Sequence, residues 1–221
     1  MISRTESMRS KVLLVDDHAS VREGLALTIN SQADLIVCGE AEEANQALDA
    51  IAMHKPDVAV IDISLGGRSG LELIRDIRLR HSRLPLLVFS MHDEAVYGER
   101  AIRSGAQGYV HKKESVHKVV AAIRRILNGH TCLSEPLANR ILQNAMQGQP
   151  VGVLACDKLT NRELEILQLI GEGHGSQQIA RDLGMSERTV ETHRLHIRRK
   201  LGVAGAAQLL QHAIQWVRSQ K

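Results

Sequence analysis

The sequence predicts an α/β N-terminal domain with a five-stranded, parallel, doubly wound sheet (flavodoxin-like), followed by an all-α four-helix domain. Three observations indicate this arrangement. Over the first 130 residues, five short apolar runs alternate with five helical patterns. The inner runs are apolar throughout rather than alternating, as expected for strands buried on both faces. The last 65 residues show helical patterns only, so the fold class changes along the chain.

The elements of the first domain follow one another in strict alternation. The expected strands lie at 11–17, 34–41, 57–63, 84–91 and 108–112. The expected helices lie at 19–31, 43–53, 69–81, 94–104 and 115–128. Strands that alternate with helices are joined by crossover connections and therefore pair in parallel. In such a sheet, the binding site lies at the carboxyl ends of the strands.

The pattern breaks after Gly129, which sets the expected domain boundaries. Residues 11–129 form the first domain, behind an N-terminal extension at 1–10. Residues 130–157 form a linker, with a helix expected at 134–147 and a loop at GQPVG (148–152). Residues 158–221 form the second domain.

Four helices are expected in the second domain. Thr160 and Glu163 make the T-x-x-E pattern of a capping box, which predicts that a helix begins there. Further helices are expected at about 176–182, 186–201 and 205–218. The stretch QQIARDLGMSERTV (177–190) has helix-turn-helix spacing, with Gly184 in the turn. A four-helix scaffold that binds nothing is the alternative.

Composition and charge narrow the classes of function. A hydrophobic content of 43% is sufficient for folded cores, and no apolar run approaches the roughly 20 residues of a membrane span. We therefore expect a cytoplasmic protein without a membrane partner. Three widely separated cysteines (Cys38, Cys132 and Cys156) fit a reducing compartment and idle thiols. Residues 157–221 carry ten basic and seven acidic side chains, against 18 of each before them, which hints at a polyanionic partner.

The helical period sorts the expected helix at 186–201 into two faces. Val190, Ile197 and Leu201 form an inward stripe. The opposite face presents a leucine among polar side chains, which suits a DNA major groove with its thymine methyl groups: Arg188, Glu191, Thr192, Leu195 and Arg199. Four basic side chains are placed for phosphates: His193, Arg198, Arg199 and Lys200. Glu191 is open to two interpretations, as an acceptor for a cytosine amino group or as an intrahelical partner of Arg188 or Arg194.

The stretch LTNRELEILQLIGEG…QIARDLGMSERTVETHRLHIRRKLGV closely resembles the LuxR-type DNA-binding domain. The likeness covers residues 158–220 or so. It implies a four-helix domain that binds DNA as a homodimer, with the helix at 205–218 as the dimerisation helix.

Polar side chains end four strands of the first domain. Asp16 and Asp17 end the first strand, Asp62 the third, Ser90 the fourth and Lys112 the fifth. Three clustered carboxylates repel one another unless a cation joins them, and Mg²⁺ fits as a hard, oxygen-seeking ion. The set can accept a phosphoryl group. The Asp62 carboxylate attacks, Mg²⁺ neutralises the phosphoryl oxygens, and Lys112 and Ser90 hold them.

The segments LLVDDH, VIDISL, FSM and GYVHK closely resemble the response-regulator receiver domain across residues 11–128. This resemblance implies that Asp62 is the phosphoacceptor, and that Asp16, Asp17 and the main-chain carbonyl of Ser64 complete the metal site. It also implies that Ser90 and Tyr109 form the switch beside Lys112. Ser64 and His92 occupy positions that tune dephosphorylation in the family.

Together the two resemblances imply a response regulator of the NarL/FixJ type. It would be a transcriptional regulator rather than an enzyme, apart from its own phosphoryl transfer and dephosphorylation. A sensor histidine kinase would phosphorylate Asp62, promoting dimerisation and sequence-specific DNA binding, and RNA polymerase is a further candidate partner. The main alternative is a regulator that binds DNA without phosphorylation and uses its receiver as a dimerisation scaffold.

Two other classes are disfavoured by particular residues. A phosphatase of the haloacid-dehalogenase type needs a second acid two residues after the nucleophile, where Ser64 stands. A metal site at His193 and His196 lacks further ligands nearby in the sequence.

Overall fold

The computed structural model describes residues 9–65, 68–146 and 159–219. The chain forms two compact units, Met1–Glu135 and Pro136–Lys221, each of which is described by itself. Most of the expected N-terminal extension and residues 147–157 of the expected linker lie outside the described residues. The domain boundaries drawn from the sequence stay predictions.

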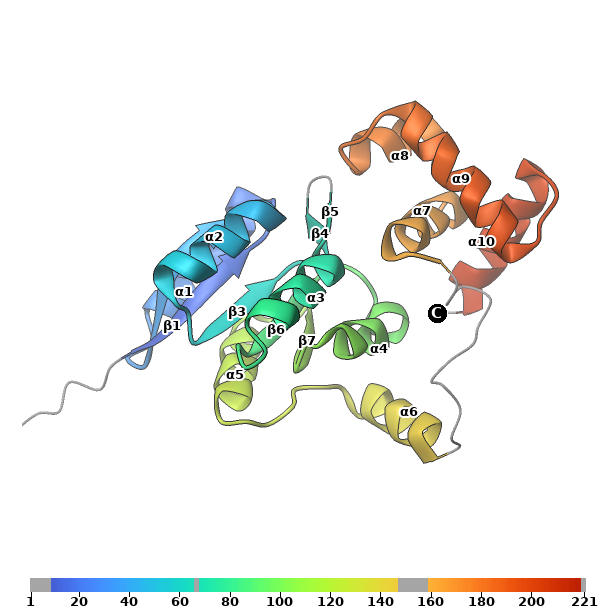
Figure 1. Cartoon of the computed structure of the whole chain (residues 1–221). Helices are drawn as coiled ribbons and strands as arrows, with labels where there is room; N and C mark the ends of the chain where they lie inside the picture. The colour runs from blue at the N-terminus through green and yellow to red at the C-terminus, as the bar shows by residue number, and fades with distance from the viewer. Residues whose placement is uncertain (1–8, 66–67, 147–158, 220–221) are drawn as a thin grey trace, which may run out of the picture. The chain divides into compact units, whose positions relative to one another are not determined.

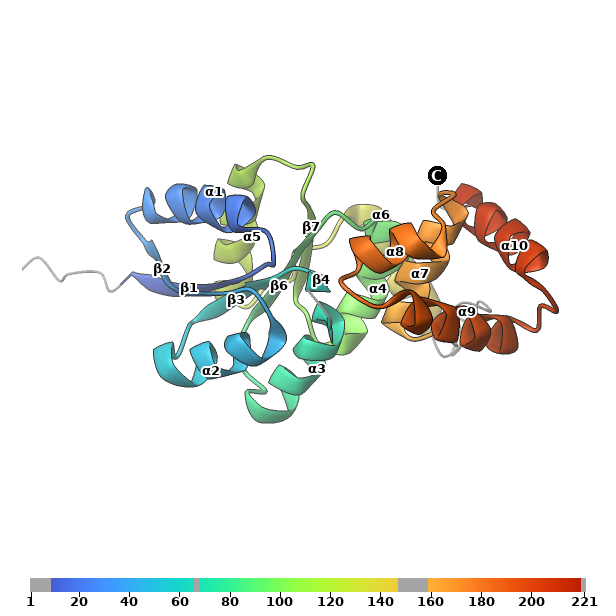
Figure 2. The ribbon, with the colours of Figure 1, turned by 90° about the horizontal axis from the view of Figure 1, so that it is seen from above.

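The N-terminal unit contains the predicted five-stranded parallel sheet, in the order β2–β1–β3–β6–β7 (Figures 1 and 2). Its strands are β1 (Ser10–Val15), β2 (Leu35–Ala41), β3 (Val58–Ile61), β6 (Leu86–Ser90) and β7 (Gly108–His111). The fold class is confirmed. Val15 pairs with Ile61 at the ends of β1 and β3, so the residues that follow these two strands emerge side by side.

Helices cover both faces of this sheet. They are α1 (Ala19–Asn30), α2 (Ala44–His54), α3 (Gly70–Arg80), α4 (Glu94–Ser104) and α5 (Val116–Leu127). Figure 2 shows α1 and α5 on one face and α2 and α3 on the other. Under α1 and α5, Val12, Leu14, Ile29 and Ile123 are almost fully buried. Each such side chain contributes roughly 1.5–3 kcal/mol by burial, which makes the sheet a rigid platform for its loops.

A small antiparallel hairpin, β4 (Ser64–Leu65) and β5 (Arg68–Ser69), follows β3 and was not expected from the sequence. Strands of two residues are too short to show an alternating pattern. The hairpin leads into α3, where the Ser69 hydroxyl accepts a hydrogen bond from the Leu71 amide. The Gly70 amide donates to the Ile63 carbonyl at 2.7 Å, which ties the start of α3 to the segment after β3.

The C-terminal unit is helical, as predicted. It comprises α6 (Glu135–Met146), α7 (Asn161–Gly171), α8 (Ser176–Asp182), α9 (Glu187–Leu201) and α10 (Ala206–Ser219). Helix α9 packs on α7 and α8, and α10 packs on α7. The approach of α7 to α10 is close, because a Cβ atom on Gly171 would lie 2.5 Å from the Ala213 carbonyl oxygen.

The capping box at the start of α7 is present in full. The Thr160 hydroxyl accepts from the Glu163 amide at 3.3 Å, and the Thr160 amide donates to Glu163 Oε2 at 2.7 Å.

We predict that Thr160→Ala lowers the free energy of unfolding by about 1 kcal/mol, because an amide at the helix start loses its acceptor. Urea unfolding of the full chain measures this loss. Thr160→Ser keeps the oxygen and should retain most of the stability; an equal loss in both variants would assign the effect to the methyl group instead.

Candidate functional site

Three carboxylates gather where β1 and β3 end. Asp16 and Asp17 follow β1, and Asp62 follows β3. Asp16 and Asp62 are each 3% exposed, whereas Asp17 faces solvent. One oxygen from each carboxylate and one ring nitrogen of His18 lie within 4.8 Å of one another. The register of the two parallel strands brings these residues together.

Lys112 follows β7 and completes the cluster. Its Nζ atom lies 2.6 Å from Asp16 Oδ2 and 2.6 Å from Asp62 Oδ2. Its amide donates to the Ser90 carbonyl at 2.8 Å, which fixes the end of β7 against β6. Burial acts to lower the pKa of Lys112, but the charges and hydrogen bonds of Asp62 and Asp16 outweigh it and raise that pKa. The side chain is therefore a charged ammonium at neutral pH.

The donor set leaves room for a cation. Asp62 Oδ1 is buried and has no hydrogen-bond partner in the described part of the chain. One ammonium faces three carboxylates, so the cluster keeps a negative excess if all of them are ionised. An orphaned carboxylate oxygen beside two other acids fits a hard cation with oxygen ligands. The ligand types in the cluster and their positions therefore fit Mg²⁺.

The two switch candidates meet at His92. Ser90 ends β6 and is fully buried, and its hydroxyl oxygen lies 3.4 Å from the His92 amide. The Tyr109 hydroxyl donates to the His92 carbonyl at 2.7 Å. Burial, and then the charge of Asp62, raise the pKa of Tyr109 well above its ordinary value, so it is a neutral donor. Tyr109 is 4% exposed, so its ring lies inside the unit in this structure.

Sequence reasoning missed the roles of His18 and Arg22. The His18 amide donates to Asp16 Oδ1 at 3.0 Å, and its Nδ1 atom lies 2.6 Å from Asp17 Oδ1. The buried Arg22 donates to the Asp16 carbonyl at 2.6 Å. The signal available for His18 was its place directly after two acids at a strand end. No comparable signal was available for Arg22, because the acidic partners of its side chain lie on the following strand, β2, and directly after it.

In the C-terminal unit, α9 shows the two expected faces. Val190 and Ile197 are fully buried, while Leu201 is only half-buried. The side chains expected to read DNA are all exposed: Arg188, Glu191, Thr192, Leu195 and Arg199. Leu195 is 37% exposed among them. This face thus presents one apolar side chain among polar and charged ones, the combination that the sequence predicted for it.

Three side chains of α9 contact other residues of the same unit, and of these contacts only the one between Glu191 and Arg194 was among the interpretations of the sequence. Lys200 Nζ lies 2.6 Å from Glu163 Oε2, at the start of α7. His193 is half-buried, and burial lowers its pKa against the opposing charge of Glu163. Glu191 accepts a hydrogen bond from Ser176 and lies 3.8 Å from Arg194 Nε, as its intrahelical interpretation requires. Among the basic residues assigned to phosphates, Arg199 is exposed, whereas Arg198, like His193 and Lys200, is half-buried.

Residues 12–124, just over half of the chain, match the family described as response regulator receiver domain. The chain belongs to the response regulators. Residues 157–213 of this response regulator match the family described as bacterial regulatory proteins, luxR family. The oxygen regulatory protein NreC of Staphylococcus aureus strain JH9 is 34% identical to it over 210 residues, which cover 93% of this chain and 97% of NreC.

Solved structures agree with this assignment. A LuxR-family two-component response regulator from Aurantimonas sp. SI85-9A1 is 33% identical, with a TM-score of 0.57, over 62% of this chain and 99% of that one. The response regulator ChrA of a heme-sensing two-component system is 31% identical, with a TM-score of 0.50, over 94% and 98% of the two chains.

The pairing of a receiver with a LuxR-type domain makes this response regulator a phosphorylation-dependent regulator of transcription. In the described part of the chain, no helix is both long and apolar enough to cross a membrane.

Proposed function

We propose that Asp62 accepts the phosphoryl group, that a sensor histidine kinase supplies it, and that phosphorylation promotes dimerisation and sequence-specific DNA binding through α9. One observation carries this proposal. Asp62 is a buried carboxylate with one oxygen held by Lys112 and the other without a partner in the described residues. A free oxygen on an otherwise fixed carboxylate is what an attack on phosphorus requires.

The transfer follows from the positions of these side chains. One carboxylate oxygen of Asp62 attacks the phosphorus, an acyl phosphate bond forms, and the bond from phosphorus to the donor breaks with its electron pair going to the donor, while the second carboxylate oxygen stays available to the cation. Mg²⁺, held by Asp16, Asp17, Asp62 and the main-chain carbonyl of Ser64, would supply charge neutralisation for the phosphoryl oxygens. Lys112 already bridges Asp16 and Asp62, so its ammonium is placed to bind one of those oxygens.

The switch then acts through Ser90, His92 and Tyr109. The Ser90 hydroxyl binds a phosphoryl oxygen, which favours one arrangement of the segment that carries His92. The position of Tyr109 depends on this arrangement because its hydroxyl donates to the His92 carbonyl. Phosphorylation thereby shifts a pre-existing equilibrium toward the state that dimerises.

The proposal is tested by intact mass and light scattering with acetyl phosphate and Mg²⁺, together with DNA affinity. We expect one added phosphoryl group, a dimer and tighter DNA binding. Unchanged DNA binding by a protein that gains no phosphoryl group would favour the alternative, in which the receiver serves only as a dimerisation scaffold.

DNA contacts are proposed for the exposed face of α9 and for Arg198, with RNA polymerase as a further candidate partner. His193 and Lys200 are weaker candidates because both face Glu163.

We predict that Arg199→Ala lowers the slope of log affinity against log salt concentration by about 0.9, the value for one lost phosphate contact. Fluorescence anisotropy on a duplex selected from a random library measures the slope. Arg80→Ala removes an equal charge from an exposed position at the end of α3 and should leave the slope unchanged; equal changes in both variants would contradict a local contact.

A further inference from the structure

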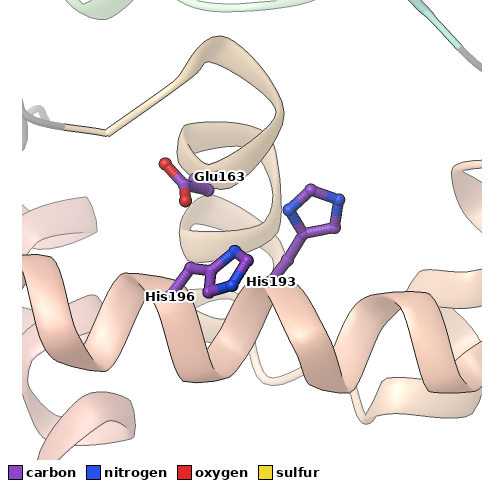
Figure 3. Close-up of side chains that lie close together, drawn as sticks. All are labelled: Glu163, His193 and His196. Atoms are coloured by element: carbon purple, nitrogen blue, oxygen red, sulfur yellow. The ribbon is translucent and has the colours of Figure 1, made fainter.

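A second cluster of metal-ligating side chains lies in the C-terminal unit, and the proposed function does not use it. Glu163 comes from the first turn of α7, and His193 and His196 lie one turn apart on α9. One ligand atom from each of the three lies within 4.8 Å of the others. Figure 3 shows both rings on the side of α9 that faces α7, the helix that carries Glu163. The fold therefore brings to His193 and His196 the third ligand that the sequence did not show.

The residue types suit a transition-metal ion. Two imidazole nitrogens and one carboxylate oxygen form a common protein ligand set for Zn²⁺, with the fourth position open to water. Ligand atoms around a tetrahedral Zn²⁺ lie ~3.4 Å apart, given metal–ligand distances near 2.1 Å. The ligand atoms here lie within 4.8 Å of one another, so only a small adjustment separates them from that spacing. His196 is exposed, so a rotation of its ring can close the gap without disturbing the core.

His193 supplies an independent indication. Its Nδ1 atom is buried and has no hydrogen-bond partner in the described residues. A buried ring nitrogen without a partner, next to a buried carboxylate, can be satisfied by a cation that both side chains share.

Glu163 has a specific oxygen available. Its Oε2 atom is already bound by the Thr160 amide at 2.7 Å and by Lys200 Nζ at 2.6 Å. These contacts hold the carboxylate in one orientation, so Oε1 is the oxygen left for an ion. The ammonium of Lys200 lies close by and repels a second cation. An ion that binds mainly by charge is therefore disfavoured, and an ion that forms strong bonds to imidazole nitrogens is favoured.

We propose that Glu163, His193 and His196 bind one divalent transition-metal ion, with Zn²⁺ the best suited. The ion fastens α9 to the start of α7 and places positive charge beside Leu195 and Arg199 on the exposed face of α9. This site is separate from the acidic cluster and does not depend on phosphorylation of Asp62.

The test uses the full chain in excess Mg²⁺, so that the acidic cluster is not counted. Zn²⁺ is titrated by calorimetry, and Co²⁺ is added as a visible-absorption probe of coordination. We expect the wild type to bind one more equivalent of Zn²⁺ than His196→Asn, whose affinity at this site falls by about 100-fold or more, since even outer-shell partners are worth 10- to 100-fold. The matched control His117→Asn, at an exposed histidine of α5, should bind as the wild type does.

The Co²⁺ spectrum separates this site from adventitious binding. A four-coordinate nitrogen and oxygen site absorbs much more strongly in the visible range than an octahedral one. We expect the strong band in the wild type and in His117→Asn, and its loss in His196→Asn. Equal Zn²⁺ stoichiometry and spectra in all three proteins, or no strong band in the wild type, would overturn the proposal. Circular dichroism verifies that His196→Asn is folded.

Discussion

Asp62→Asn is expected to abolish phosphorylation and, with it, the gain in DNA affinity on treatment with acetyl phosphate. An amide oxygen is too weak a nucleophile to attack phosphorus, whereas the shape of the side chain is unchanged. The asparagine carbonyl can still accept the Lys112 hydrogen bond that now measures 2.6 Å, and Lys112 keeps its ion pair with Asp16. The variant should therefore fold normally. Intact mass should show no added phosphoryl group, and its DNA affinity should be the same with and without the donor.

The matched control is Asp49→Asn, which removes the same charge from an exposed position on α2. This variant should gain one phosphoryl group and respond as the wild type does. A phosphoryl group still present on Asp62→Asn would place the acceptor elsewhere in the cluster, with Asp16 and Asp17 as the first positions to examine.

Gly70→Ala is expected to disable the same site without altering any of its polar groups. A Cβ atom at position 70 would lie 1.8 Å from the Asp62 carbonyl oxygen, a distance that requires the backbone to move. Overpacking of this kind costs about 1–3 kcal/mol of stability. Displacing the phosphoacceptor by about 1 Å can slow a reaction on the order of 100-fold. The rate of phosphoryl incorporation and urea unfolding measure the two effects.

Gly24→Ala provides the comparison for this substitution. Gly24 lies inside α1, and a Cβ atom there would meet nothing within 4 Å. The change should stabilise the protein by about 0.5–1 kcal/mol, because alanine favours the helix. Normal phosphorylation of Gly70→Ala would contradict the link between the start of α3 and the position of Asp62.

The sheet and the location of its site were accessible from the sequence because both depend on local patterns. Apolar runs alternating with helices determine a parallel topology, and the topology alone places Asp16, Asp62 and Lys112 at one edge. The capping box was accessible for the same reason, since Thr160 and Glu163 are only three residues apart. The roles given to individual site residues, by contrast, stay predictions until the experiments above are done.

Contacts between distant residues were not accessible from one sequence. Lys200 and Glu163 are 37 residues apart, and the local sequence around neither residue predicts their ion pair. Lys200 instead follows two arginines on a basic helix, so a phosphate contact was the natural interpretation. The hairpin at Ser64 was too short to show a period. The carboxylate beside His193 and His196 could not be predicted either, because it depends on the packing of α7 on α9.

Glu163 is a single side chain that serves two helices. It closes the capping box of α7 through Thr160, and it anchors the last turn of α9 through Lys200. The energetic effects of substitutions at Thr160 and Lys200 should consequently be epistatic, since each change alters the orientation of the carboxylate that the other one uses. Substitutions at the start of α7 are thereby coupled to substitutions in the last turn of α9, and neither position can be exchanged independently of the other.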